Sequence, residues 1–152
     1  MSDQIRIIIA DDHPIFRAGL RQIIDSERRF TVIAEADNGE TALQLIEREK
    51  PDIVVLDVNM PKMTGFAVAK ALREKQIGCE IVVLTMHSEE AMFNKAMDLG
   101  VKGYLLKESA AIEIVNCLIA VHKGEFCTSP TVTTYLFKRA RRITEKKAAS
   151  KI

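Results

Sequence analysis

The chain of 152 residues is 47% apolar and 28% charged with a net charge of +1, a composition typical of a globular protein that forms one ordinary domain. This balance excludes whole-chain disorder, collagen and coiled coil. The three cysteines form no Cys-x-x-Cys pair, and charges interrupt every apolar run well short of a signal peptide or a membrane span, so a cytoplasmic protein without a membrane contact is expected.

Short apolar segments alternate along the chain with longer amphipathic ones. Four of the five short segments are nearly continuous or β-branched, as expected for strands that other elements cover on both faces. We therefore predict strands at residues 5–10, 30–36, 53–56, 81–84 and 103–106.

Each predicted strand is followed by a stretch in which apolar residues recur at the spacing of one helix face. Pro14 suits the first position of the first helix, and Asn38, Ser88 and Ser109 are expected to cap later helices. Five repeats of strand and helix predict a parallel sheet with helices on both faces, joined by right-handed crossovers. The apolar positions that define the helices are Phe16, Leu20, Ile23 and Ile24, then Ala42, Leu45 and Ile46, then Val68 and Leu72, then Phe93, Ala96 and Met97, and finally Ile112, Val115 and Ile119.

The pattern changes after Lys123, where Gly124 ends the last of these helices, and we divide the chain into a domain at 1–123 and a segment at 124–152. Residues 126–130 are expected to form a connector, followed by one short amphipathic helix that carries basic side chains. The last fifteen residues hold seven basic residues and one acid, a local charge of +6 that leaves −5 on the remainder. An acidic body with a basic tail indicates two functional parts.

The carboxyl ends of parallel strands meet at one edge of a sheet, where ligands bind in such folds. The predicted strand ends place Asp11, Asp12, Asp57, Thr85 and Lys107 at this edge and none of them at the opposite one. Each residue alone has an ordinary explanation as a cap, a turn residue or a surface charge, but their joint placement favours a binding site. Crowded carboxylates repel one another unless a cation joins them, and a hard Mg²⁺ ion suits oxygen ligands.

These residues stand in motifs that resemble the receiver domain of bacterial two-component response regulators, over roughly residues 5–123. The Asp-Asp-His-Pro and Leu-Thr-Met-His segments are similar to the NarL/FixJ subgroup, which carries a LuxR-type helix-turn-helix. The resemblance implies a flavodoxin-like, doubly wound sheet of five parallel strands in the order 2-1-3-4-5, within three layers. The motifs are IADDHP at 9–14, LDVNMP at 56–61 with Gly65, LTMH at 84–87 and GYLLK at 103–107.

The resemblance also implies a phosphorylation site and a metal site. Asp57 would be the phosphoacceptor, which takes a phosphoryl group from a phosphohistidine on a sensor histidine kinase. Asp12, Asp57 and the backbone carbonyl of Asn59 would bind Mg²⁺ directly, and Asp11 would act largely through water. Because a carboxylate is a weak nucleophile, positioning and charge neutralisation must carry such a transfer.

Further roles follow from the same resemblance. Thr85 would bond one phosphoryl oxygen and Lys107 would pair with another. Tyr104 would change rotamer together with Thr85 as a switch, although ordinary packing of a strand aromatic is the alternative. His87 would tune hydrolysis of the phosphoryl group together with Asn59. The new phosphoryl charge would then bias a loop and a helix between two states.

Two residues depart from the pattern of many receivers. Glu108 stands where proline often follows the lysine, so a cis-proline turn is not available there. Met86 is larger than the alanine or glycine common after the threonine, and we expect it to narrow the access of the phosphodonor.

The full protein is expected to be a transcription regulator that binds DNA only through a LuxR-type domain, which nothing after Lys123 supplies. Dimer formation on phosphorylation is implied by the resemblance, and turnover catalysis is not expected. The alternatives are a stand-alone receiver that acts by phosphorelay or protein contact, and a Mg²⁺-dependent hydrolase. The basic tail is expected to be a linker, with weak nucleic-acid contact or self-association through Leu136 as alternatives. Zinc and nucleotide sites are excluded because ligand spacing and a glycine-rich phosphate loop are missing.

Overall fold

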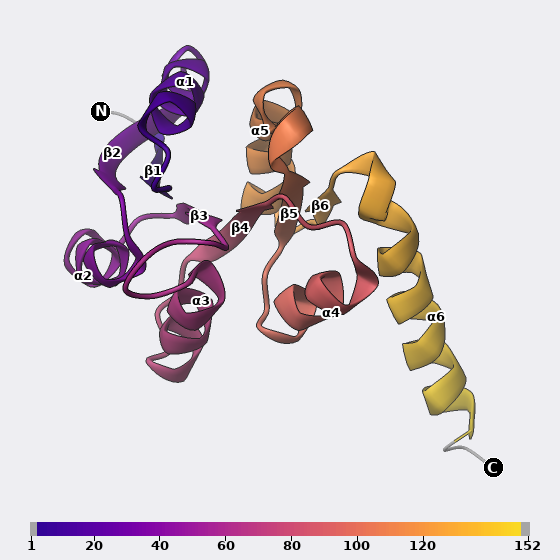
Figure 1. The fold of residues 1–152 in the computed structure, drawn as a ribbon. Helices are drawn as coiled ribbons and strands as arrows, with labels where there is room; N and C mark the ends of the chain where they lie inside the picture. The colour runs from indigo at the N-terminus through magenta and orange to yellow at the C-terminus, as the bar shows by residue number, and fades with distance from the viewer. Residues whose placement is uncertain (1–2, 150–152) are drawn as a thin grey trace.

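The computed structural model describes residues 3–149, and its centre is a parallel sheet of six strands (Figure 1). The strand order β2-β1-β3-β4-β5-β6 contains the predicted order 2-1-3-4-5, so the predicted fold class is confirmed. The strands are β1 (Ile5–Ala10), β2 (Phe30–Ala36), β3 (Ile53–Asp57), β4 (Glu80–Thr85), β5 (Gly103–Leu106) and β6 (Cys127–Thr128).

The sequence pattern predicts only a connector at residues 126–130, but the chain forms β6 there. Cys127 pairs with Gly103, and Thr128 pairs with Tyr104, in parallel register. These bonds satisfy backbone groups of β5 that would otherwise be unpaired along the edge of the sheet. Because such unpaired groups readily bond another segment, two residues suffice to extend the sheet.

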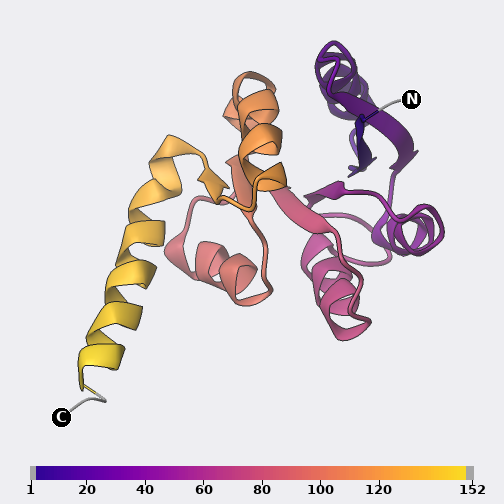
Figure 2. The same cartoon turned by 180° about the vertical axis from the view of Figure 1, so that it is seen from behind.

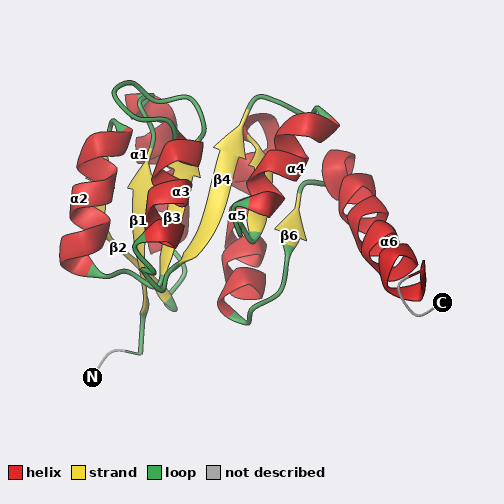
Figure 3. Cartoon of the chain, turned by 90° about the horizontal axis from the view of Figure 1, so that it is seen from below, coloured by secondary structure: helices red, strands yellow, loops and turns green. Residues whose placement is uncertain are grey.

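Helices cover both faces of the sheet, with α1 and α5 on one face and α2, α3 and α4 on the other (Figures 1 and 3). Successive strand residues point to opposite faces. Ile7 and Ile9 therefore join the core beneath α1 and α5, whereas Ile8 joins the core beneath α2, α3 and α4. The helices are α1 (Pro14–Asp25), α2 (Gly39–Glu49), α3 (Gly65–Glu74), α4 (Glu90–Asp98), α5 (Lys107–His122), a short 3₁₀ helix η1 (Pro130–Val132) and α6 (Thr133–Ala149).

The helix starts agree only in part with the predicted caps. Helix α1 begins at Pro14 and the Asn38 side chain caps α2, as predicted. The Ser88 prediction is wrong, because α4 starts one residue later than Ser88 would cap. The Ser109 prediction is also wrong, since the chain passes from β5 directly into α5 at Lys107 and Ser109 lies inside the first helical turn.

The buried face of α5 is rotated from the predicted one. Ile114 and Leu118 are fully buried, whereas Ile112 is 86% exposed and Val115 and Ile119 are only partly buried. Helix α5 is rich in apolar residues around its circumference, so spacing alone does not identify the face that meets the sheet.

The segment after α5 forms a longer helix than the short one predicted, because α6 runs over 17 residues. Its lead-in η1 places Val132 in the core, and Leu136 packs partly against that core, but Ile143 is 53% exposed. Figure 2 confirms that α6 lies beside α4 and that its C-terminal end extends away from the sheet. Within residues 3–149, no helix has the length and apolar character needed to cross a membrane.

Candidate functional site

Four of the predicted site residues converge at the carboxyl edge of the sheet. Asp11 follows β1, Asp57 ends β3, Thr85 ends β4, and Lys107 begins α5. The Lys107 ammonium lies 2.9 Å from Asp11 Oδ2 and 3.0 Å from Asp57 Oδ2. Asp11, Asp57 and Thr85 are buried, and the Lys107 side chain is only 8% exposed. The convergence that the sequence predicts is therefore present.

A close approach of two backbone segments fixes the loop after Asp57. A Cβ atom at Gly65 would lie 2.3 Å from the Asp57 carbonyl oxygen, closer than real side chains come. The Gly65 N–H donates to the Val58 carbonyl at 2.9 Å, and the Asn59 N–H donates to Asp57 Oδ1 at 3.1 Å. This loop therefore holds the Asp57 carboxylate in one orientation.

Burial and charge act together on the central acid and base. Burial raises the pKa of Asp57; the hydrogen bond from Lys107 opposes this effect and the Asp11 carboxylate adds to it. Burial alone would lower the pKa of Lys107. Its contacts with Asp11 and Asp57 outweigh this effect and raise the pKa of the ammonium. One ammonium thus faces two buried carboxyl groups, an arrangement that favours a further cation.

Asp12 and His13 form the open side of the site, with side chains 33% and 63% exposed. His13 Nδ1 lies 2.9 Å from Lys107 Nζ and 3.1 Å from Asp11 Oδ1. His13 is not among the predicted site residues, although its place directly after two acidic site residues is a signal that could have identified it.

The acidic cluster could hold a metal ion. Asp11, Asp12, His13 and Asp57 each offer one ligand atom, and these atoms lie within 4.8 Å of one another. Asp11 Oδ2 and Asp12 Oδ1 are buried atoms. Asp11 Oδ2 faces the Lys107 ammonium at 2.9 Å, and Asp12 Oδ1 lies 3.2 Å from His13 Nδ1. Such carboxylate oxygens are the donors that a hard divalent cation takes, so Asp11, Asp12 and Asp57 fit this group, and the role of the Asn59 carbonyl stays a prediction.

A chain of hydrogen bonds leads from Thr85 into the loop between β4 and α4. Thr85 Oγ1 accepts from the His87 N–H at 3.0 Å, and the Tyr104 hydroxyl donates to the His87 carbonyl at 2.8 Å. Tyr104 is fully buried, and burial raises its pKa to about 12 against an opposing effect of the Thr85 hydroxyl. Thr85 and Tyr104 therefore contact the same short backbone segment, which is compatible with their predicted role as a switch pair.

The rim of the site holds the remaining predicted residues. Asn59 Nδ2 lies 3.5 Å from His87 Nε2, so the pair assigned to hydrolysis does meet. Met86 is 72% exposed and borders an open hollow of about 440 Å³ with Lys107 and Glu108. The roles of Asn59 and His87 in hydrolysis, and of Met86 in access, stay predictions.

An ion-pair cluster supports Asp11 from the side of α1. Arg17 Nη1 donates to the Asp11 carbonyl at 2.6 Å, and Arg17 Nε donates to Glu35 at 2.9 Å. Arg21 also pairs with Glu35. Burial opposes ionisation of Glu35, but the two arginines outweigh it and lower the pKa of Glu35. Sequence reasoning missed this support, although an acid inside an otherwise apolar strand indicates a buried cation nearby.

The strand order and the acidic edge with its paired lysine define a flavodoxin-like domain of the receiver class. The family model described as the response regulator receiver domain matches residues 7–119. The chain belongs to this family, and the resemblance that its motifs predict is confirmed.

Individual relatives agree with this assignment. The transcriptional regulatory protein DegU of Brevibacillus brevis is 35% identical over 93% of this chain and 60% of its own length. The nitrate/nitrite response regulator NarL of Escherichia coli is 35% identical over 96% of this chain and 68% of its own length. A solved LuxR-family two-component response regulator from Aurantimonas is 32% identical, with a TM-score of 0.83 over 90% of this chain and 98% of that one. The chain thus spans about 60% of the length of DegU.

Proposed function

We propose that Asp57 is the phosphoacceptor of this receiver and takes its phosphoryl group from a phosphohistidine of a sensor histidine kinase. The observation that carries this proposal is the buried Asp57 carboxylate, whose Oδ2 lies 3.0 Å from the Lys107 ammonium. A carboxylate oxygen attacks phosphorus, the bond between phosphorus and the histidine nitrogen breaks, and the imidazole leaves with the electron pair. Hydrolysis of the acyl phosphate by water then slowly returns Asp57 to its free form.

The surrounding residues stabilise the charge that this transfer moves. Lys107 pairs with one phosphoryl oxygen, and the Thr85 hydroxyl donates to another. Asp12, Asp57 and the Asn59 carbonyl would hold Mg²⁺, with Asp11 acting largely through water. When bound, the ion neutralises phosphoryl charge and lowers the repulsion between the phosphodonor and the carboxylates. His13 is a nitrogen donor, which suits a hard cation less well than the oxygen ligands.

We further infer that the receiver belongs to a LuxR-type transcriptional regulator that dimerises on phosphorylation and binds DNA through a separate domain. The resemblance to DegU and to the Aurantimonas LuxR-family regulator supports this inference. These relatives favour it over the alternative of a stand-alone receiver. No observation at the site favours a hydrolase.

The test is treatment of the purified chain with acetyl phosphate and Mg²⁺, followed by intact mass spectrometry and peptide mapping. We expect one phosphoryl group on Asp57 in the wild-type chain and none in Asp57→Asn. The matched control is Asp52→Asn, because Asp52 directly precedes the same strand at its opposite end. Asp52→Asn should label like the wild type. Phosphorylation that persists at full level in Asp57→Asn would overturn the assignment.

A further inference from the structure

Two of the three cysteines meet between α5 and the edge of the sheet. Cys117 is fully buried on α5 and Cys127 is half-buried in β6, and both are free thiols. Both side chains pack in the apolar core on the face of the sheet that α1 and α5 cover. The Cys117 thiol donates a hydrogen bond to the Cys127 sulfur, so the two sulfur atoms are in direct contact.

A glycine on the neighbouring strand lets α5 come close enough for this contact. Gly103 of β5 is the register partner of Cys127. A Cβ atom at Gly103 would lie 3.1 Å from the Cys117 sulfur, so α5 packs on the backbone of β5 at this point. The Cys127 N–H also donates to the Lys102 carbonyl at 3.0 Å, which holds Cys127 beside that glycine. The contact between the thiols therefore follows from the packing of α5 on the sheet.

The surroundings make the two thiols chemically unequal. The hydrogen bond from Cys117 lowers the pKa of Cys127, against the opposing effects of burial and of the Glu113 carboxylate. The same hydrogen bond, together with burial, raises the pKa of Cys117. Because the thiolate is the reactive form of cysteine, Cys127 is the sulfur that reacts first, and it is also the more exposed of the two. Cys117 then lies in position to react with Cys127 in a second step.

The third cysteine has neither a thiol partner of this kind nor a favourable pKa. Cys79 precedes β4 and packs against the core on the opposite face of the sheet. Burial raises the pKa of Cys79 to about 11, so little thiolate is present at neutral pH. Cys79 is therefore an internal control for the pair.

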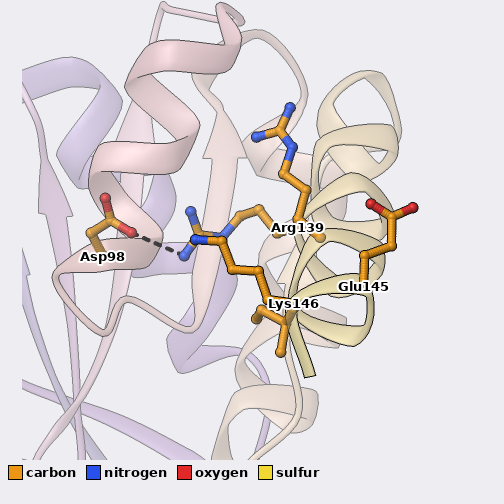
Figure 4. Close-up of a pocket in the computed structure, with 6 residues that line it drawn as sticks. Asp98, Arg139, Glu145 and Lys146 are labelled. Carbon is orange, nitrogen blue, oxygen red and sulfur yellow. Dashed lines mark hydrogen bonds and ion pairs between the residues drawn. The ribbon is translucent and has the colours of Figure 1, made fainter. Parts of the chain in front are cut away.

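Cys127 lies at the start of the segment that carries α6. Gly124, with a φ of +86°, turns the chain between α5 and β6, which comprises only two residues. Farther along, Arg139 of α6 donates to Asp98 of α4 at 3.0 Å (Figure 4). The Asp98 side chain is 71% exposed, and ion pairs in solvent contribute little individually. A covalent bond at Cys127 would therefore add a strong restraint to a segment that is otherwise held by weak contacts at its exposed end.

We propose that Cys117 and Cys127 form an oxidative modification site, at which hydrogen peroxide generates a disulfide that covalently joins β6 to α5. The Cys127 thiolate attacks one peroxide oxygen, the O–O bond breaks, and hydroxide leaves and takes a proton to become water. Cys127 is then a sulfenic acid.

The second step closes the disulfide. The Cys117 sulfur attacks the Cys127 sulfur, the S–O bond breaks, and the hydroxide that leaves takes the Cys117 proton to become a second water. The two thiols lose two electrons in total, and one peroxide gains them. A disulfide requires the sulfurs to lie about 2 Å apart, and thiols already in contact reach this distance by small movements.

Peroxide treatment of the fully reduced chain, followed by alkylation and peptide mapping without reductant, tests the site. We expect the monomer to lose about 2 Da, the mass of two hydrogen atoms. The peptides of Cys117 and Cys127 should be joined, with Cys79 still alkylated, and dithiothreitol should restore the original mass. Complete alkylation of Cys117 and Cys127 after peroxide treatment would overturn the proposal, as would a disulfide that instead joins Cys79 or a second chain.

Three variants separate the roles of the thiols. Cys117→Ser keeps a hydroxyl that can donate to Cys127, and its oxidation should stop at a sulfenic acid on Cys127 that dimedone traps. Cys127→Ser should react with peroxide at least about tenfold more slowly than the wild type, because it lacks the more reactive thiol. Cys79→Ser is the matched control and should form the disulfide like the wild type. An unchanged rate in Cys127→Ser would reject Cys127 as the reactive thiol.

Hydrogen–deuterium exchange of the reduced and oxidised chains tests whether the disulfide restrains β6. The Cys127 and Ser129 amides donate to the Lys102 and Tyr104 carbonyls across the sheet edge. We expect these amides to exchange at least about fivefold more slowly in the oxidised chain, because local opening becomes harder. The amides of α2, at the far end of the sheet, should not change (Figure 1). Disulfide formation with unchanged exchange at both amides would overturn the restraint of β6.

Discussion

Several charged side chains of this receiver are held in place by oppositely charged neighbours. The best example away from the acidic cluster is Glu35, which two arginines hold in its charged form while Arg17 also holds the Asp11 carbonyl. A lowered acid pKa means that the folded chain binds fewer protons than the unfolded chain near the ordinary value. Such a group stabilises the fold above that value and loses its contribution as the pH falls through the lowered pKa.

Glu35→Gln tests this linkage. At neutral pH the variant should be less stable than the wild type by about 1 kcal/mol, since the ion pairs are only partly shielded from solvent. The difference should shrink as the pH falls below 4.5, the ordinary value for this acid, because the wild-type carboxylate also becomes protonated. Urea unfolding at several pH values measures both stabilities. If the stability difference between wild type and variant stayed constant down to pH values below the lowered pKa, the ion pairs of Glu35 would not be its source.

At the level of helices and strands, close backbone packing positions Asp57, the proposed phosphoacceptor. Gly65 starts α3 against the carbonyl of Asp57, and any side chain there would push β3 and α3 apart. The start of α3 therefore controls where the Asp57 carboxylate points. This is a packing requirement, and it explains why a glycine lies within the motif after Asp57.

Gly65→Ala should destabilise the domain by about 2 kcal/mol or more, because the new Cβ collides with rigid backbone. Gly19→Ala is the matched control, since nothing lies within 4 Å of a Cβ at Gly19 in α1. That control should stabilise the domain by roughly 0.5–1 kcal/mol, as expected for alanine inside a helix. Thermal unfolding of both variants checks the pair; equal effects would show that contact with Asp57 does not matter.

For the molecule as a whole, the segment after α5 affects where the independently folding unit ends. The division at Lys123 stays a prediction, but β6 completes the edge of β5 and Val132 is fully buried. These two features lie in the segment that the sequence assigns to a linker. The residues that lead into α6 therefore pack as part of the same folded domain.

Truncation tests this dependence. A chain that ends at Lys123 should be less stable than one that ends at Val132 by about 2–3 kcal/mol, because it loses one buried side chain and the strand pairing of β6. Both should still fold, since neither loses a site residue or a central strand. Chemical denaturation of the two chains gives the comparison; equal stability would support the division at Lys123.

The strands and the parallel sheet were predictable from the pattern of the residues, and the strand order was predictable from the motif resemblance. Period-two and near-continuous apolar runs identify β1 to β5, and the rule that parallel strands present their carboxyl ends at one edge gathers Asp11, Asp57, Thr85 and Lys107. Motif resemblance then assigned their roles. The strands and the placement of these residues were predictable because they depend on periodicity and chain direction, which a sequence states directly, whereas the assigned roles stay predictions.

Contacts between distant segments were decided only by the tertiary structure. The pairing of β6 with β5, the rotation of α5 that exposes Ile112, and the packing of Tyr135 on Phe93 each join parts of the chain whose patterns allow other partners. Two residues of strand, or one aromatic on an exposed helix, carry no periodic signal of their own. Their positions follow from which apolar surface and which backbone groups the rest of the fold leaves uncovered.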